Sequence, residues 1–149
     1  MEFKKLTIEY IDEIIDLRLK QLKDEGAVES FDLKPNLYDF YKEQLNGDSF
    51  AIFGAIEDGK IIATGSLSTC YKPPYYNCPN GKIGLLSSMY VNPDYRRCGI
   101  ATKMLDLITS YARDNEFSLI HITASKMGEL LYSKYGFIKK NNFMEYKLQ

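Results

Sequence analysis

The fold of this chain is decided by one stretch, Met89-Tyr90-Val91-Asn92-Pro93-Asp94-Tyr95-Arg96-Arg97-Cys98-Gly99-Ile100-Ala101-Thr102. An apolar strand ends at its Asn92-Pro93 pair, a short basic loop follows, and an amphipathic helix begins near Gly99. The first turn of a helix leaves backbone N–H groups without acceptors, and the helix dipole adds positive charge there. Gly99 permits close approach to the backbone, while Arg96 and Arg97 add positive charge. The stretch therefore predicts a site for an anion such as a pyrophosphate.

The segments around this stretch predict a βαβ unit. Ile83 to Val91 is strand-like, Gly99 to Asn115 has the apolar spacing of a helix, and Phe117 to Ala124 is again strand-like. A strand, a helix and a second strand in this order normally form a parallel pair with a right-handed crossover.

The remaining carboxyl-terminal residues predict one helix and two strands. Lys126 to Tyr135 has helical spacing, and Gly136 is suited to terminate that helix. Phe137 to Lys139 and Phe143 to Leu148 are expected to pair as strands around Asn141-Asn142.

Two helices are predicted before any sheet. The first begins after Thr7 as its N-cap and ends at Gly26; the second begins near Asn36 and ends at Asn46-Gly47. A hairpin should follow, since Phe50 to Ile56 and Ile61 to Thr69 are apolar runs rich in β-branched residues.

Asp58-Gly59 is suited to the tight turn of that hairpin. The prolines and glycine between Tyr71 and Lys82 predict a long irregular loop after it.

Length and composition exclude several classes of protein. A chain of 149 residues is expected to form a single domain over 1–149, and 45% hydrophobic with 26% charged residues argues against disorder. The 19 Lys and Arg nearly balance the 20 Asp and Glu, so we expect neither nucleic acid nor membrane as a partner. The apolar runs are too short for a membrane helix, and the amino terminus lacks a signal-peptide pattern, so the expected location is the cytoplasm.

Cysteine and histidine chemistry has little support. Cys70, Cys78 and Cys98 are an odd number without metal-ligand spacing, and His121 is the only histidine. We therefore expect no metal. Cys98 precedes a helix, where thiols are often reactive, but His121 lies in an apolar run and is better explained as a strand residue than as the base of a Cys-His pair.

Taken together, these segments resemble the GCN5-related N-acetyltransferase (GNAT) superfamily. Arg96-x-x-Gly99-x-Ala101 is similar to its cofactor loop, and Leu130-Leu131-Tyr132-Ser133-Lys134-Tyr135-Gly136-Phe137 is similar to a second family block. The resemblance covers nearly the whole chain. It implies an α+β fold with a mostly antiparallel central sheet of six to seven strands, a splayed parallel pair and about four flanking helices.

The resemblance also implies acetyl-CoA as cosubstrate. Met89 and Val91 would bind pantetheine through their backbone, and Arg96 to Thr102 would bind the pyrophosphate. Ser125 stands where many members carry Asn and would contact the cofactor through its hydroxyl. The expected cofactor set is Met89, Tyr90, Val91, Arg96, Arg97, Cys98, Gly99, Ile100, Ala101, Thr102 and Ser125.

For the chemistry, Tyr132 matches the family tyrosine that protonates the departing thiolate, and the Met89 N–H would polarise the carbonyl. The base is left open, because Ser87 and Ser88 stand where many members have a carboxylate. The alternatives are water relayed through serine or backbone, or a carboxylate from the amino-terminal half: Glu25, Glu29 or Asp32.

The expected activity is an N-acetyltransferase acting on a small-molecule or peptide amine, with a homodimer left open. Two other functions compete with it. The missing strand carboxylate favours a non-catalytic sensor that keeps the acyl-CoA groove. A nucleic-acid-binding role for Arg96 and Arg97 conflicts with the near-neutral charge and the lack of a basic stripe.

Overall fold

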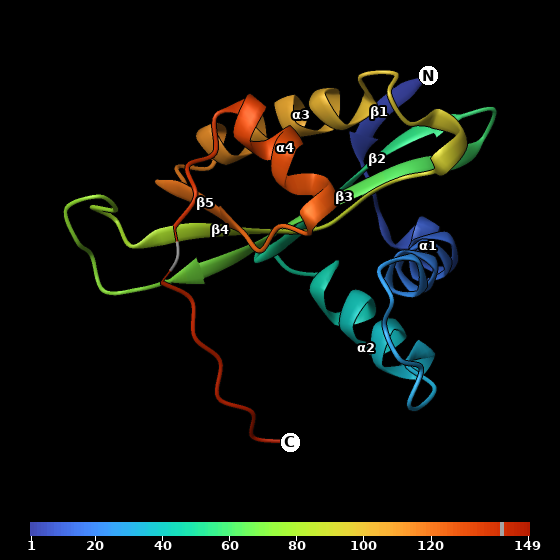
Figure 1. Cartoon of the computed structure of the whole chain (residues 1–149), viewed down its shortest axis with the longest axis horizontal. Helices are drawn as coiled ribbons and strands as arrows, with labels where there is room; N and C mark the ends of the chain where they lie inside the picture. The colour runs from blue at the N-terminus through green and yellow to red at the C-terminus, as the bar shows by residue number, and fades with distance from the viewer. Residues whose placement is uncertain (141) are drawn as a thin grey trace.

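The computed structural model describes residues 1–140 and 142–149, in which a five-stranded sheet is flanked by four helices (Figure 1). The strands are β1 (Glu2–Lys5), β2 (Phe50–Glu57), β3 (Lys60–Tyr71), β4 (Lys82–Val91) and β5 (Leu119–Ile122). The helices are α1 (Ile11–Asp24), α2 (Lys34–Gln44), α3 (Ile100–Asp114) and α4 (Lys126–Tyr135). The strands are ordered β1-β2-β3-β4-β5; all neighbours are antiparallel except β4 and β5, which are parallel.

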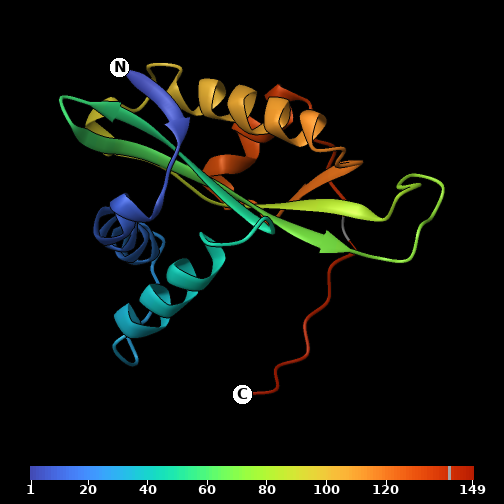
Figure 2. The same cartoon turned by 180° about the vertical axis from the view of Figure 1, so that it is seen from behind.

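Helices cover both faces of the sheet, with α3 and α4 on one face and α1 and α2 on the other (Figures 1 and 2). Side chains alternate along β2 accordingly. Ala51, Phe53 and Ala55 pack in the core beneath α3, whereas Phe50 and Ile52 pack in the core against α1 and α2. A strand buried on both faces reads as a continuous apolar run, which is why Phe50 to Ile56 was recognisable in the sequence.

The predicted hairpin is confirmed. β2 and β3 pair around Asp58 and Gly59, whose φ angles are +50° and +76°. Two consecutive residues with positive φ form the tight turn that matches the twist of antiparallel strands, and an Asp-Gly pair adopts it readily.

The parallel pair diverges towards the carboxyl end of β4. The register with β5 runs from Ile83↔Leu119 to Leu86↔Ile122, and β4 then continues to Val91 after β5 has ended. On its other edge β4 pairs with β3 in an irregular register, in which Ser66 pairs with Ser87 and Thr64 pairs with Tyr90. The single residue Gly65 of β3 therefore opposes two residues of β4, Ser88 and Met89. Ser88 has a φ of +55°, which marks a β-bulge beside the divergence.

Gly65 is required at this bulge. A Cβ atom built on Gly65 would clash with Met89 Sδ and would lie 3.0 Å from Ile108 Cδ1. The absent side chain therefore makes room for Met89 between the strands and α3.

Two predictions about the amino-terminal elements are wrong. The short strand β1 precedes the helices, so two helices do not come before any sheet. Thr7 precedes a 3-10 turn over Ile8–Tyr10 and makes no capping hydrogen bond, while the α-helix begins at Ile11. A four-residue edge strand has little local signal, because its pairing with β2 depends on contacts far away in the sequence.

The sheet also has fewer strands than the six to seven expected. Within the described residues, Phe137 to Lys139 and Phe143 to Leu148 form no strand, and the tail runs away from the sheet (Figure 1). The predicted turn at Asn141-Asn142 includes Asn141, which lies outside the described residues. Phe143, Met144, Tyr146 and Leu148 are exposed, so apolar alternation alone did not provide a strand partner.

No helix in 1–140 or 142–149 is long and apolar enough to cross a membrane.

Candidate active site

The amino terminus of α3 is open to a ligand. Its N-cap is Gly99, with φ +77°, which has no side chain to bond the first-turn N–H groups. The first backbone hydrogen bond of the helix is donated by the Lys103 N–H to Gly99 O at 3.1 Å. The N–H groups of Ile100, Ala101 and Thr102 therefore have no acceptor within the helix. The first turn, which the structure describes in full, carries no acidic residue. An anion is the natural acceptor for these groups.

The amino terminus of α4, unlike that of α3, is capped by a side chain. Its N-cap is Ser125, whose Oγ accepts a hydrogen bond from the Gly128 N–H at 3.2 Å, and Glu129 lies in its first turn. One of its first-turn N–H groups is thus capped by a side chain, and an acidic residue already lies in that turn. The predicted cofactor residue Ser125 is a helix cap that can still donate its hydroxyl hydrogen to a ligand.

The basic loop before α3 has one anchored and one outward-facing arginine. Arg96 donates from Nε to Val91 O at 2.9 Å and lies 5.6 Å above the centre of the Tyr90 ring. Arg97 is exposed and has a φ of +62°. Cys98 is exposed, and its Sγ donates to Arg96 O at 3.5 Å. Both guanidinium groups therefore belong to the loop that opens the helix with free N–H groups.

The edge of β4 next to the divergence carries backbone groups that point away from β3. Asn92 N–H donates to Ile62 O at 2.8 Å, so Asn92 and Tyr90 face β3, and the intervening Val91 faces the opposite edge. Met89 O accepts from Gln21 Nε2 at 3.1 Å, and Val91 O accepts from Arg96 Nε. Side chains rather than a neighbouring strand hold these two carbonyls.

Two predicted cofactor residues have buried side chains with structural contacts. Tyr90 is buried, and its hydroxyl donates to Asp24 Oδ2 on α1 at 2.9 Å. Ile100 is buried in the core beneath α3. Only the backbone of these residues can face a ligand, whereas Ala101 is half-buried and Thr102 exposed.

Tyr132 lies on α4, and 7% of it is exposed. Its ring packs edge-on against Phe137 with the centroids 5.6 Å apart, and Gly128 leaves space for it, because a Cβ there would lie 2.8 Å from Tyr132 Cε2. Burial, and secondly the negative charge of Glu25, raise the pKa of Tyr132 to about 12. The phenol therefore keeps its proton at neutral pH.

A network of polar side chains extends from α1 to the Met89 carbonyl, and the sequence analysis identified only one of its members, Glu25. Arg18 donates from Nη1 to Gln21 Oε1 at 3.1 Å. The buried Gln21 donates from Nε2 to Met89 O and to Glu25 Oε1, the latter at 3.2 Å. These residues are three and four apart and share one helix face. The signal in the sequence is this polar spacing within an otherwise apolar stripe.

The structure separates the candidate bases. Glu25 is linked through Gln21 to Met89, and its charge acts on Tyr132. Asp32 instead accepts from the Lys34 N–H at 3.1 Å before α2, and Glu29 is exposed in the loop between α1 and α2. Glu25 is thus the one of these three whose contacts lead to the predicted site.

A small cavity of about 170 Å³ lies beside the bulge, between the sheet and the α1–α2 face. Ser87 and Ser88, where many relatives were expected to carry a carboxylate, line it together with Ser66. Ser66 Oγ lies 2.9 Å from Ser87 Oγ and donates to Ser87 O at 3.0 Å. Arg18 and aromatic residues of α2 complete its wall.

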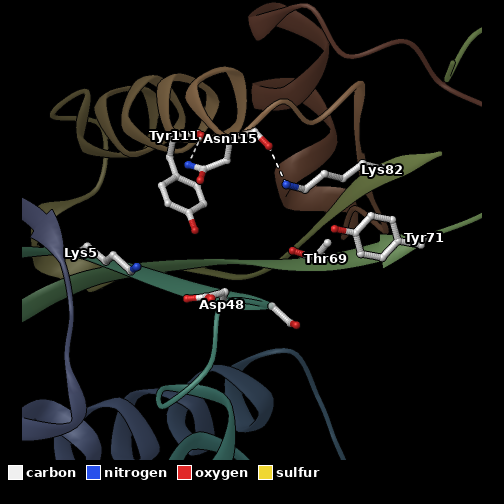
Figure 3. Close-up of a pocket in the computed structure, with 8 residues that line it drawn as sticks. Lys5, Asp48, Thr69, Tyr71, Lys82, Tyr111 and Asn115 are labelled. Carbon is white, nitrogen blue, oxygen red and sulfur yellow. Dashed lines mark hydrogen bonds between the residues drawn. The ribbon is translucent and has the colours of Figure 1, made fainter. Parts of the chain in front are cut away.

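A larger cavity of about 420 Å³ lies at the other end of α3 (Figure 3). There the Tyr111 hydroxyl points toward Asp48, and Lys82 Nζ donates to Asn115 O at 2.6 Å. The 15 residues of α3 span about 22 Å, so this cavity is far from the open helix terminus. None of the predicted site residues lines it.

Cys98 and His121 belong to different parts of the molecule. Cys98 lies in the loop before α3, whereas His121 is exposed on β5 and pairs in register with Leu85. His121 is a strand residue, as expected.

Comparisons with known proteins identify the family of the chain. The family model described as the Acetyltransferase (GNAT) family matches residues 11–137. A predicted acetyltransferase from Clostridium acetobutylicum, solved with acetyl-CoA, has 31% identity and a TM-score of 0.93 over 98% of this chain and 95% of that one. A GCN5-related N-acetyltransferase from Ralstonia eutropha has 20% identity and a TM-score of 0.87, over 99% and 97% of the two chains.

A glucosamine-6-phosphate N-acetyltransferase from Arabidopsis thaliana has 21% identity and a TM-score of 0.77, over 99% and 98% of the two chains. None of the curated proteins matches the chain. At about 20% identity the last two structures show the fold alone, whereas the family model spans most of the sequence. The chain belongs to the acetyltransferase (GNAT) family and is an N-acetyltransferase.

Proposed function

We propose that residues 1–149 form one domain that transfers the acetyl group of acetyl-CoA to a primary amine. The observation that carries this proposal is the uncapped amino terminus of α3, with Arg96 and Arg97 before it and the unpaired edge of β4 beside it. The pyrophosphate binds the N–H groups of residues 99–102. Pantetheine lies along the free edge of β4 and accepts a hydrogen bond from the N–H group of Val91, while the N–H group of Met89 faces the acetyl carbonyl at the end of the pantetheine arm.

The amine attacks the thioester carbonyl, and the C–S bond to the coenzyme breaks. The Met89 N–H, beside the bulge, stabilises the negative charge that develops on the carbonyl oxygen. Tyr132 acts as the general acid at the departing sulfur. With a pKa of about 12 the phenol carries the proton that this role needs throughout the neutral range. Ser125 donates its hydroxyl hydrogen to the cofactor.

Glu25 is the proposed base. The attacking nitrogen loses one proton, which needs an acceptor close to the acetyl group. Gln21 bonds both Glu25 and the Met89 carbonyl, so the carboxylate lies one amide group away from the strand end where the acetyl group is proposed to bind. The serines at positions 87 and 88 offer hydroxyls but no carboxylate.

Two measurements test the proposal. Acetyl-CoA at ~100 times its dissociation constant should stabilise the fold by roughly 2.7 kcal/mol, which a thermal shift measures. With an amine panel, the release of free thiol should then report turnover. Binding without thiol release from any amine would instead identify a sensor module.

Replacing Tyr132 separates the general acid from the rest of the site. Tyr132→Phe should lower kcat by roughly 10²- to 10⁴-fold with little change in the Kd for acetyl-CoA. Tyr135→Phe is the matched control on the same helix; its hydroxyl donates to Asp106 Oδ1 at 2.7 Å, away from the proposed site. Equal turnover by Tyr132→Phe and the native protein would eliminate Tyr132 as the acid.

A further inference from the structure

The small cavity beside the bulge has two chemically different walls. Leu37, Phe40, Tyr41 and Phe50 supply an apolar and aromatic side from α2 and the start of β2. Serine hydroxyls from β3 and β4 supply the opposite side; they belong to Ser66, Ser68, Ser87 and Ser88. A ligand here therefore needs an apolar body that packs against α2.

Arg18 is the charged residue of this cavity. Among the described residues that line it, none is acidic. Within the part of the chain that the structure describes, Arg18 forms no ion pair and donates instead to the neutral Gln21. Arg18 and Tyr41 line the same cavity, and the positive charge of Arg18 opposes the rise that burial causes in the pKa of Tyr41. The cavity thus offers a cation to its ligand.

The cation is connected to the proposed reaction centre. Gln21 accepts from Arg18 through Oε1 and donates to Met89 O through Nε2, so a single amide group separates the guanidinium from the strand end. A ligand that reaches Arg18 with one end can present its other end to the acetyl group proposed to lie at Met89.

We propose that the acceptor amine carries an anionic group that pairs with Arg18 and a small apolar body that fills the cavity, as in a hydrophobic amino acid. This inference rests on the proposed function, since it assigns the acceptor of the same site. A polycationic amine lacks a partner here, because a positively charged cavity without a carboxylate repels it.

The volume agrees with a single small side chain. The cavity measures about 170 Å³, and an apolar cavity of roughly 150 Å³ is known to hold a benzene molecule. One aromatic ring or one branched aliphatic chain therefore fits.

The test compares pairs of amines that differ in the anion alone, by thiol release with saturating acetyl-CoA. L-Phenylalanine is paired with L-phenylalaninamide, and glucosamine 6-phosphate with glucosamine, so that a carboxylate and a phosphate are tested separately. The anionic member should have a kcat/KM at least about tenfold higher, as expected for a charge-assisted hydrogen bond. A preference in the phenylalanine pair supports both parts of the proposal, whereas a preference in the glucosamine pair alone would keep Arg18 as the partner of the anion but overturn the apolar body.

Arg18→Gln should remove the preference, because the amide keeps a bond to Gln21 but carries no charge, and Arg18→Lys should restore part of it. Arg113→Gln on the exposed side of α3 is the matched control and should leave the preference unchanged. The comparison within each pair uses the native protein, so it stands even if an Arg18 variant folds poorly.

The outcomes distinguish the two proposals. Acetylation of amines with no preference for the anionic member in either pair, or fastest turnover with an aminoglycoside such as kanamycin, would overturn the assignment of Arg18 and leave the acetyltransferase proposal intact. Failure of acetyl-CoA to shift the melting temperature, together with no thiol release from any amine, would instead overturn the proposed function and the acceptor assignment with it.

Discussion

Replacing Gly99 with alanine isolates the role of the α3 amino terminus. Gly99 has φ +77°, and a Cβ built on it meets no atom within 4 Å, so the substitution introduces conformational strain without a steric clash in the protein. Holding a non-glycine residue in the left-handed region costs about 1–2 kcal/mol. For a chain of this size the melting temperature should fall by about 2–4 °C per kcal/mol.

Gly59 provides a matched control. Its φ is +76°, its Cβ would also meet nothing within 4 Å, and it lies in the β2–β3 turn, away from the proposed site. Gly59→Ala should therefore lower the melting temperature by a similar amount. The two variants should differ in their affinity for acetyl-CoA.

The expected difference in affinity follows from the contacts with the phosphates. The methyl group of Gly99→Ala would stand where the pyrophosphate approaches the backbone, weakening hydrogen bonds to a charged group that contribute roughly 1.5–3 kcal/mol each. Loss of one such bond raises the Kd by about tenfold or more. Titration calorimetry with acetyl-CoA measures this directly. If both alanine variants kept the native Kd, the α3 amino terminus would not be the pyrophosphate site.

Two further predictions concern Tyr132 and Glu25. The folded protein holds the Tyr132 proton more tightly than the unfolded chain, so the associated stability is complete below pH 10 and is lost as the pH rises to about 12. Two pKa units correspond to about 3 kcal/mol. Urea unfolding between pH 8 and 12 should show that the native protein loses about this much more stability than Tyr132→Phe, in which the other tyrosines with raised pKa values still titrate. Parallel curves for the two proteins would contradict the prediction. Glu25→Gln should slow turnover at neutral pH, with a smaller defect at alkaline pH where the amine is already deprotonated; a pH–rate profile measures this. The same substitution should lower the pKa of Tyr132, because it removes a negative charge, and ultraviolet titration measures that change. Glu29→Gln, in the exposed loop, is the control, and an equal defect in both variants would eliminate Glu25 as the base.

Much of the architecture was predictable because its signals are local. Asp58-Gly59 identified the hairpin, and the predicted bounds of α4, Lys126 and Tyr135, are those observed. The βαβ unit was also predicted, although α3 begins at Ile100 and β5 is shorter than expected. In each case glycine conformation and apolar spacing act over a few residues, which a single sequence displays directly.

The failures involve pairing partners. Glu2–Lys5 forms a strand only because β2 presents an edge to it, and Phe143 to Leu148 forms none although its apolar residues alternate. Whether a short alternating segment pairs depends on which edge is available, a property of the assembled sheet.

The sequence by itself therefore determined the helix terminus at which we propose that the pyrophosphate binds, since an Arg-rich loop, a glycine and a following helix are contiguous between Arg96 and Thr102. Only the tertiary structure decided which groups surround the proposed position of the acetyl group. Gln21 on α1 bonds the Met89 carbonyl, 68 residues later in the chain, and in turn bonds Arg18 and Glu25. Such contacts are set by how α1 packs across the bulged end of β4, and no local pattern encodes that packing.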